Sequence, residues 1–449
     1  MTISDKKEPL ILLLGDILFF YLSLWVSLFI RYGELPGKNV LEQHFLPFSI
    51  LSIAWIIVFF IAGLYEKHTL FLKSRLPKTV LSAQVINSIV AFLFFYFIPY
   101  FGITPKTNLF IYLFISFLFI LGWRNIFLRF AKVAKRQKGI LIGSGKELIE
   151  LREEIEENNR YNIELVSAID LESADFKDFH KEIINRIYSA GVSIVIIDIK
   201  HEKLKSILPH LYNLIFSKVY FIDMHNVYEE IFDRIPLSLV RYSWFIEHLS
   251  LQPKSAYDVV KRAIDIIFSF AIGILSLILY PFTALAIKID DGGSIFYVNK
   301  RLGKNNKIIS IIKFRTMSGK DTGKESTRSH NKITRVGKFL RQTRIDELPQ
   351  LWNVFRGDLS LIGPRPEIPE LAHIYEEEVP YYNVRHLIKP GLSGWAQIYQ
   401  LNPPKFETQA DSTKIKLSYD LYYIKNRSIL LDLVITLKTL KALISRVGV

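Results

Sequence analysis

Four long apolar stretches open the sequence, at residues 9–30, 47–65, 80–101 and 108–123. Each is close to the roughly 20 residues that an α-helix needs to cross the hydrocarbon core of a bilayer. A cleavable signal peptide would explain only the first stretch, and no small-residue cleavage site follows it. The pattern therefore predicts a bundle of four transmembrane helices over residues 1–136.

The loops between these stretches differ in positive charge. Those on one side hold only Arg31, Lys38 and Lys106, whereas those on the other side are rich in Lys and Arg. Because cytoplasmic loops carry the excess of basic residues, we expect both ends of the bundle, and all that follows, to face the cytoplasm. The basic loops contain Lys67, Lys73, Arg75 and Lys78, and then Arg124, Arg129, Lys132, Lys135 and Arg136.

A fifth apolar stretch, residues 264–287, has basic residues on both sides, including Arg262 before it and Lys288 after it. A simple span would place one of these flanks outside the cell. Pro281 lies within the stretch, where it removes a backbone donor and favours a bend. We therefore expect a re-entrant helix over residues 258–289, which enters and leaves the membrane on one face; a plain fifth span is the alternative.

Residues 137–250 show a different pattern, in which short β-rich runs such as "VSIVIIDI" alternate with polar helical segments. This alternation predicts a doubly wound parallel sheet. The turn at Gly143, Ser144 and Gly145 could present backbone amides to a phosphate. Leu148 replaces the third glycine of G-x-G-x-x-G, so a regulatory or purely structural role stays open beside nucleotide binding.

The composition is typical of a membrane protein and limits the classes of partner that it can bind. Of the 449 residues, 50% are hydrophobic and 14% aromatic, and the formal net charge is +14. Anionic lipid headgroups and phosphorylated substrates suit such a chain. Nucleic acid is the less favoured partner, because the basic residues flank apolar runs. The sequence has no cysteine, which excludes disulfides, thiolate metal sites and cysteine nucleophiles.

The candidate chemistry lies in residues 251–449, where Arg, Lys, Gly and Pro are frequent. Asp346 and Glu347 stand side by side in "TRIDELPQLWN", just before the helix start that Pro349 indicates. Acids at this position can simply compensate a helix dipole. The surrounding cations instead favour a site that holds a diphosphate, and they are Lys313, Arg315, Arg341, Arg344, Arg356 and Arg365.

An adjacent pair of acids suits phosphoryl transfer. A carboxylate attacks phosphorus when positive charge or a metal draws electron density from the phosphoryl group. Magnesium prefers one or two carboxylates plus substrate phosphates, so this pair, with no His or Cys cluster, fits Mg²⁺ better than zinc. We expect one acid of the pair to be the nucleophile and the other to bind the metal, and the candidate metal ligands are Asp346 and Glu347.

The motifs of this region, taken in order, resemble those of the bacterial sugar transferase family. These are polyprenyl-phosphate phosphoglycosyl transferases with a single re-entrant membrane helix. The whole chain is similar to the long form that initiates exopolysaccharide and O-antigen repeats, with four spans and a Rossmann-like domain before a mainly helical catalytic domain. The matching pieces are Lys261, Arg262 and Asp265, then "KFRTM", "DELPQLWNV", "GDLSLIGPRP", "PGLSGWAQ" and "DLYYIKN".

The resemblance implies a two-step exchange at the bacterial inner membrane. Asp346 would attack the β-phosphate of a UDP-sugar, UMP would leave, and polyprenyl (undecaprenyl) phosphate would take the phosphosugar from the enzyme. Glu347 matches the metal-binding or orienting acid. The substrate-binding residues that the match implies are Lys261, Arg262, Lys313, Arg315, Arg341, Arg365, Gln397 and Asp420.

Two motifs depart from the family pattern. Tyr280-Pro281 stands where a Ser-Pro pair usually breaks the membrane helix, and Ile398-Tyr399 follows "GWAQ" where the family commonly continues through Gly-Arg. The alternative functions are a glycosyl transferase that releases UDP and a non-catalytic membrane scaffold or regulator of polysaccharide assembly. No motif identifies the sugar, and the bundle and middle domain offer ample surface for a homodimer.

Overall fold

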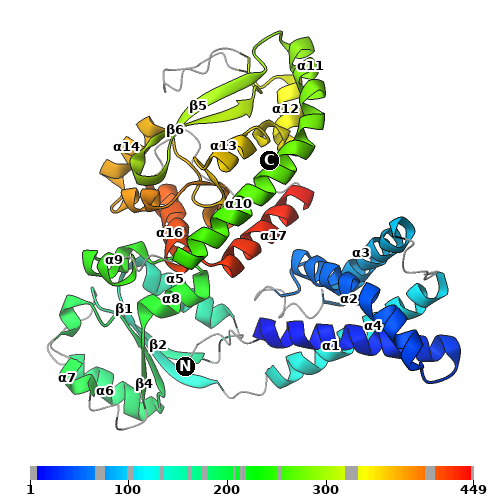
Figure 1. Cartoon of the computed structure of the whole chain (residues 1–449). Coiled ribbons are helices and arrows are strands. Elements are labelled where there is room, and N and C mark those ends of the chain that lie inside the picture. The colour runs from blue at the N-terminus through cyan, green and yellow to red at the C-terminus, as the bar shows by residue number, and fades with distance from the viewer. Residues whose placement is uncertain are drawn as a thin grey trace. The chain divides into compact units, whose positions relative to one another are not determined.

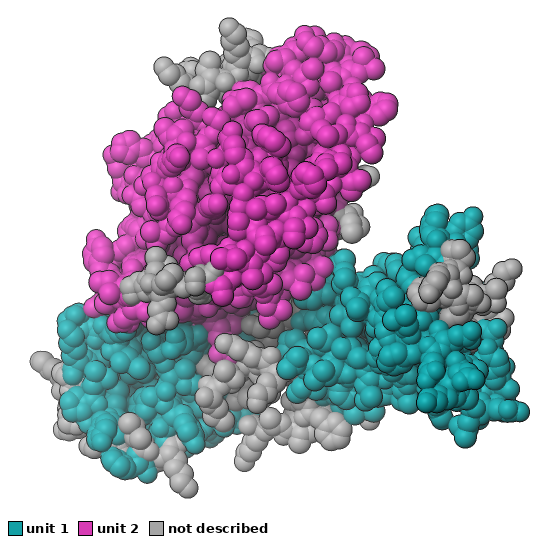
Figure 2. Space-filling model, in the orientation of Figure 1, with its two compact units in different colours: residues 1–227 teal, residues 228–449 magenta. Residues whose placement is uncertain are grey.

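The protein is described here from a computed structural model, which divides into two compact units, residues 1–227 and 228–449 (Figure 2). It is mostly helical and contains a four-stranded parallel sheet (Figure 1). The structure describes residues 8–65, 76–98, 106–131, 136–158, 161, 163–173, 179–205, 208–212, 216, 219–249, 255–318, 332–399 and 410–445.

The first unit begins with four helices, each long and apolar enough to cross a membrane. They pack around one core in which the rings of Phe48, Trp55 and Tyr112 contact one another. The helices are α1 (Glu8–Tyr32), α2 (Lys38–Ile61), α3 (Leu76–Phe97) and α4 (Lys106–Ala131). Residues 99–101 of the third predicted stretch and the loop residues Lys67, Lys73, Arg75, Lys132 and Lys135 lie outside the described residues.

An ion pair is buried among these helices. Arg124 donates to Asp16, and their side chains are 1% and 0% exposed. Arg124 also donates to the carbonyl of Leu64 at 2.8 Å, and the Tyr65 hydroxyl donates to Asp16 at 2.8 Å. Charges in apolar surroundings are costly unless they are paired. The pair therefore joins the first half of α1, the turn that follows α2 and the last part of α4. Because the start of α1 contacts the end of α4, these two helices run antiparallel.

The middle of the chain forms the predicted parallel sheet, with strand order β2-β1-β3-β4. The strands are β1 (Gln137–Gly143), β2 (Ile163–Asp170), β3 (Ile194–Ile197) and β4 (Tyr220–Asp223). The chain adds β2 on one side of β1 and then β3 and β4 on the other, which is the doubly wound arrangement. The accompanying helices are α5 (Gly145–Glu157), α6 (Phe179–Ala190), α7 (Leu208–Tyr212) and α8 (Met224–Phe232).

Local structure explains both glycines in the turn between β1 and α5. A Cβ on Gly143 would lie 2.3 Å from the sulfur of Met224, and Gly145 has a φ of +79°. Close packing and a left-handed backbone both favour glycine. Nucleotide binding at this turn stays a prediction.

The second unit contains the region of the candidate acids. Its two small sheets are the antiparallel pair β5 (Phe296–Leu302) and β6 (Ile308–Phe314), and the parallel pair β7 (Ser360–Ile362) and β8 (Gly391–Ser393). Its helices are α9 (Tyr242–Leu249), α10 (Ser255–Ser276), α11 (Tyr280–Asp290), α12 (Arg335–Thr343), α13 (Gln350–Arg356), α14 (Pro369–Glu378), α15 (Trp395–Tyr399), α16 (Ala410–Asn426) and α17 (Ile429–Ser445).

The residues just before α10 belong to the core of this second unit. Ile235 and Trp244 are buried with Leu371 and Leu421. Residues 235–249 lie before the predicted domain boundary and pack against residues that follow it. The predicted boundary at residue 250 itself lies outside the described residues.

The fifth apolar stretch forms α10 and α11, which follow each other end to end in Figure 1. A 3₁₀ turn, Leu277–Leu279, separates them, and Pro281 lies in the first turn of α11. Residues 256–290 form a fifth candidate membrane segment of 35 residues. Its large apolar side chains are mostly exposed, as at Phe268 (53%) and Phe282 (69%).

Both ends of this stretch are hydrogen-bonded to the same unit. Near its start, Arg262 donates to the carbonyls of Val354 and Phe355, each at 2.7 Å. Near its end, the Asp290 carboxylate accepts from the backbone N–H of Val336 at 2.9 Å. The helices that flank the acid pair, α12 and α13, are therefore attached to opposite ends of the apolar stretch.

Candidate active site

The acid pair lies in a tight turn between α12 and α13. Thr334 caps α12 by accepting from the backbone N–H of Gly337 at 2.9 Å. That helix ends at Arg344, whose φ of 57° is left-handed. A single 3₁₀ turn, Ile345–Glu347, then precedes α13. Asp346 and Glu347 thus lie just before a helix N-terminus, as the sequence predicts.

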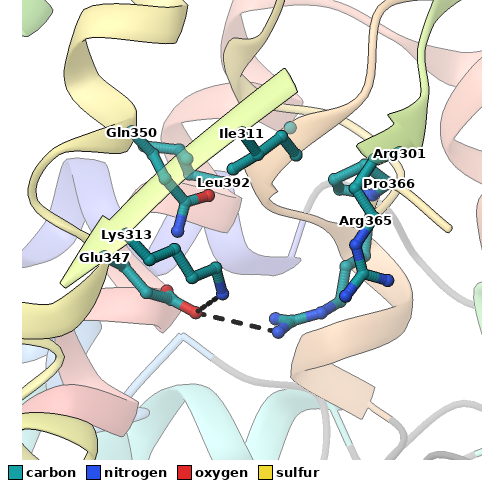
Figure 3. Close-up of a pocket in the computed structure, with 9 residues that line it drawn as sticks. Arg301, Ile311, Lys313, Glu347, Gln350, Arg365, Pro366 and Leu392 are labelled. Atoms are coloured by element: carbon teal, nitrogen blue, oxygen red, sulfur yellow. Dashed lines mark hydrogen bonds and ion pairs between the residues drawn. The ribbon is translucent and has the colours of Figure 1, made fainter. Parts of the chain in front are cut away.

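Glu347 lies among three cations. Its Oε1 is 3.3 Å from Lys313 Nζ and 3.7 Å from a guanidinium nitrogen of Arg365 (Figure 3). It is also 3.7 Å from a guanidinium nitrogen of Arg344. Burial by itself raises the pKa of a carboxyl group, but these cations outweigh it and hold the pKa of Glu347 below its ordinary value. Glu347 is therefore ionised at neutral pH.

Asp346 has the opposite electrostatic character. The residue is 7% exposed, and its Oδ1 has no hydrogen-bond partner among the described residues. Burial, reinforced by the negative charge of Glu347, raises the pKa of Asp346 to about 6 although Lys313 and Arg344 oppose the rise. Neighbouring acids whose pKa values are driven apart are typical of sites that divide two chemical roles between two carboxyl groups.

A pocket opens beside Glu347, and four of the six matching motifs contribute residues to its walls. Lys313 and Glu347 lie together on one side of it, and Arg365 lies across from them (Figure 3). Arg365 and Pro366 come from "GPRP", and Gly391 and Leu392 come from "PGLSG". The full lining is Arg301, Ile311, Lys313, Glu347, Gln350, Arg365, Pro366, Gly391 and Leu392.

Three of the predicted substrate-binding residues have partners inside the fold. Lys261 pairs with Asp432 at 2.7 Å, and Arg262 bonds the last carbonyls of α13, as described above. Asp420 is 1% exposed and lies 2.9 Å from Arg385. None of these three lines the pocket in the part of the chain that the structure describes, and their contact with substrate stays a prediction.

The predicted substrate-binding residues that remain are Arg341, Arg315 and Gln397. Arg341 donates to the Thr316 hydroxyl at 2.9 Å and is close enough to Asp346 to lower the pKa of that acid. Arg315 pairs with Asp291 at 3.2 Å. Gln397 lies on α15, and its buried Oε1 has no hydrogen-bond partner within the described residues.

A buried ion network that was not predicted from the sequence lies behind the pocket. Glu367 accepts from Lys416 at 2.6 Å and from Arg385 at 3.4 Å. Arg385 also donates to the backbone carbonyl of Arg365 at 2.9 Å, so the network touches the pocket wall. Burial would raise the pKa of Glu367, but Lys416 and Arg385 lower it to about 2.

The candidate site fits a magnesium ion rather than a preformed metal cage. Among the described residues, no group of three or more His, Cys, Asp or Glu side chains could hold a metal. Magnesium usually takes one or two carboxylates and completes its shell with water and phosphate oxygens. Asp346, whose Oδ1 has no partner among the described residues, and the ionised Glu347 supply such a pair.

Comparison with known proteins agrees with this arrangement. Residues 256–446 match the model of the family described as bacterial sugar transferase. Over 196 residues, the chain is 36% identical to the UDP-glucose:undecaprenyl-phosphate glucose-1-phosphate transferase of Caulobacter vibrioides, covering 43% of this chain and 73% of that relative. The chain belongs to the bacterial sugar transferase family. All nine residues that line the pocket lie within the part that matches this sugar transferase family.

Two further relatives extend well beyond the region that they share with this chain. The chain is 39% identical over 213 residues to the UDP-N-acetylgalactosamine-undecaprenyl-phosphate N-acetylgalactosaminephosphotransferase of Aeromonas hydrophila, covering 45% of this chain and 49% of that one. It is 31% identical over 324 residues to the undecaprenyl-phosphate glucose phosphotransferase of Komagataeibacter xylinus, covering 68% and 58%. The match thus spans about half the length of these two relatives.

Proposed function

We propose that the protein transfers a sugar-1-phosphate from a UDP-sugar to undecaprenyl phosphate, with release of UMP. The product would be a polyprenyl-diphosphate-sugar, the first membrane-bound intermediate of a polysaccharide or O-antigen. One observation carries the proposal: Asp346 and Glu347, two adjacent acids with oppositely shifted pKa values, lie among Lys313, Arg344 and Arg365. The activities for which these relatives are named support the same class of reaction.

In the first proposed step, a carboxylate oxygen of Asp346 bonds to the β-phosphorus of the UDP-sugar. The bond from that phosphorus to the bridging oxygen breaks, and UMP leaves with the electron pair. In the second step, a phosphate oxygen of the lipid attacks the same phosphorus, and the bond to Asp346 breaks. The carboxylate is thereby restored, and both steps balance without an oxidant or reductant.

The surrounding residues have separate tasks in this scheme. Lys313 and Arg365 neutralise the diphosphate and hold it against the acids. Glu347 stays ionised and keeps these cations in place. Asp346 and Glu347 would hold a magnesium ion, which when bound neutralises the charge that develops on the phosphate oxygens.

The proposed topology is a re-entrant anchor, with the soluble parts in the cytoplasm and the protein in the bacterial inner membrane. It is supported by the basic residues on both sides of the apolar stretch 264–287 of α10 and α11, including Arg262 before it and Lys288 after it. Cytoplasmic segments carry the excess of basic residues, so a simple span would place one of these basic flanks on the opposite side of the membrane. The cysteine-free chain permits a direct test with single cysteines after residue 290: labelling by a membrane-impermeant reagent outside intact cells would refute the topology.

The nucleotide product tests the reaction. Purified full-length protein with undecaprenyl phosphate and a panel of UDP-sugars is expected to release UMP from at least one of them. Release of UDP would instead identify a glycosyl transferase that transfers only the sugar. The absence of any turnover, together with normal polysaccharide assembly in cells that carry Asp346→Asn, would favour a scaffold.

The rate of UMP release is expected to rise with pH, with a midpoint in kcat/KM near 6. The reason is that Asp346 must be ionised to attack, and its pKa in the folded protein is raised to about 6. Arg341→Met removes a cation that lowers this pKa, so its midpoint should move to higher pH, whereas Arg341→Lys should stay near the wild type. A rate that is flat between about pH 5 and pH 7.5 would contradict the assignment.

A further inference from the structure

The pocket contains a buried amide nitrogen for which the described part of the chain supplies no hydrogen-bond partner. Gln350 is the first residue of α13, is 5% exposed and lines the pocket (Figure 3). Its Nε2 has no hydrogen-bond acceptor among the described residues. Buried amide donors are nearly always paired, so an unpaired one at a pocket wall indicates that a ligand supplies the acceptor.

A second buried amide on the same helix shows what a structural role looks like. Asn353 is fully buried, and its Nδ2 donates to the carbonyl of Ser310 at 2.7 Å. Its Oδ1 accepts from the backbone N–H of Ile312 at 3.2 Å. Asn353 therefore fastens α13 to β6, whereas the amide nitrogen of Gln350 makes no comparable bond in the described structure.

The charges around Gln350 identify the class of ligand. Lys313 and Arg365 line the same pocket, and so does Arg301, which is not among the substrate-binding residues predicted from the sequence. Glu367 lies 4.0 Å from Arg301 and helps to place it. A ligand group that accepts from three cations and a neutral donor carries several negative charges, as a diphosphate does. A sugar hydroxyl is neutral and does not require three cations.

We propose that Gln350 donates a hydrogen bond from Nε2 to a phosphoryl oxygen of the donor's diphosphate, and that Arg301 pairs with the same diphosphate from the facing wall. Figure 3 shows Gln350 on the side of Lys313 and Glu347, with Arg301 beside Arg365 across the pocket. The inference rests on the proposed function, since it assigns two further residues to the binding of the UDP-sugar. Gln350 and Arg301 are thus substrate-binding residues rather than parts of the scaffold.

The test separates binding from folding by comparing Gln350→Met with Asn353→Leu in the full-length protein. Methionine keeps the volume of glutamine and removes the unpaired donor, so the thermal midpoint of Gln350→Met should equal or exceed that of the wild type. Its Kd for UDP, measured by calorimetry, should rise about tenfold or more, because a hydrogen bond to a charged group is lost. Asn353→Leu should instead lower the thermal midpoint.

Arg301 provides the second variant. Arg301→Met should weaken UDP binding by a similar factor, and Arg301→Lys should recover part of it by restoring the charge without the fork of guanidinium donors. Uridine, which lacks phosphate, serves as the control ligand, and neither substitution should change its binding. Unchanged UDP affinity in Gln350→Met, or a loss of stability like that of Asn353→Leu, would overturn the proposal.

These outcomes are distinguishable from a failure of the proposed reaction. If the wild type binds UDP and releases no UMP from any UDP-sugar, the reaction is wrong while the assignment of Gln350 and Arg301 is still decided by UDP affinity. If the wild type releases UMP and Gln350→Met does so with an unchanged KM, the reaction stands and the assignment fails. Wild-type protein that does not bind UDP refutes the assignment directly.

Discussion

Asp346→Asn is expected to abolish UMP release while making the fold more stable at neutral pH. The loss of rate should be at least about 10³-fold, because the substitution removes the proposed nucleophile. The gain in stability has a separate cause. Folding buries Asp346 beside Glu347 and raises its pKa to about 6, so the ionised form opposes folding.

The sign of the stability effect follows from the raised pKa. The favourable contribution of protonated Asp346 is fully present below the ordinary pKa of an aspartic acid, and it is lost as the pH rises through about 6. At pH 7 the free energy of unfolding of the wild type is therefore about 2–3 kcal/mol lower than that of Asp346→Asn, because asparagine never ionises. Thermal unfolding at pH 4 and pH 7 measures this difference, which should be small at the lower pH.

A matched pair of controls accompanies Asp346→Asn. Asp411→Asn changes an exposed acid on α16, whose side chain is 90% exposed, and should alter neither the activity nor the thermal midpoint. Glu347→Gln should lower activity but also stability, because it removes a carboxylate that three cations stabilise. An Asp346→Asn protein that still releases UMP at a substantial rate, or that unfolds earlier than the wild type, is incompatible with the assignment.

Arg385→Met is expected to destabilise the second unit by about 3–5 kcal/mol, the usual cost of leaving buried charges without their partner. Arg385 is 1% exposed and pairs with Glu367 and with Asp420, itself 1% exposed. A methionine would leave Asp420 buried next to an apolar side chain. In thermal terms the loss corresponds to about 10 °C for a unit of this size.

The partner substitution identifies the cause of that loss. In the double variant Arg385→Met with Asp420→Leu, one uncompensated charge is removed as well, so part of the stability should return. Arg385→Met should also weaken UDP binding, because Arg385 holds the backbone carbonyl of Arg365 at the pocket wall. A midpoint within about 2 °C of the wild type would show that the network is not needed for folding.

The parts of the fold that depend on local pattern were predictable from the sequence. Long apolar runs predicted the candidate membrane helices, and the alternation of short apolar and polar runs predicted the parallel sheet. The acid pair before α13 was recognisable because Pro349 marks a helix start. Lys313, Glu347 and Arg365 were all named as candidates, and the structure brings them into one pocket.

The remaining site residues depend on contacts between distant parts of the chain. Lys261 and Asp420 occur in recognisable motifs, but their partners are Asp432 and Arg385. A motif does not distinguish a charge that contacts substrate from one that pairs inside the fold. Gln350 looks like an ordinary residue of a first helical turn, and it becomes significant only because folding buries its amide nitrogen where the described residues offer no acceptor.

The short helix α13 has a consequence for where the reaction occurs. Its C-terminal carbonyls are bonded to Arg262 of α10, and the acid pair immediately precedes its first turn. Seven helical residues form a stiff rod about 10 Å long. The position of Asp346, the proposed nucleophile, relative to α10 is therefore set by a rigid helix and not by a loop, so a tilt of α10 would move the Asp346 carboxylate with it.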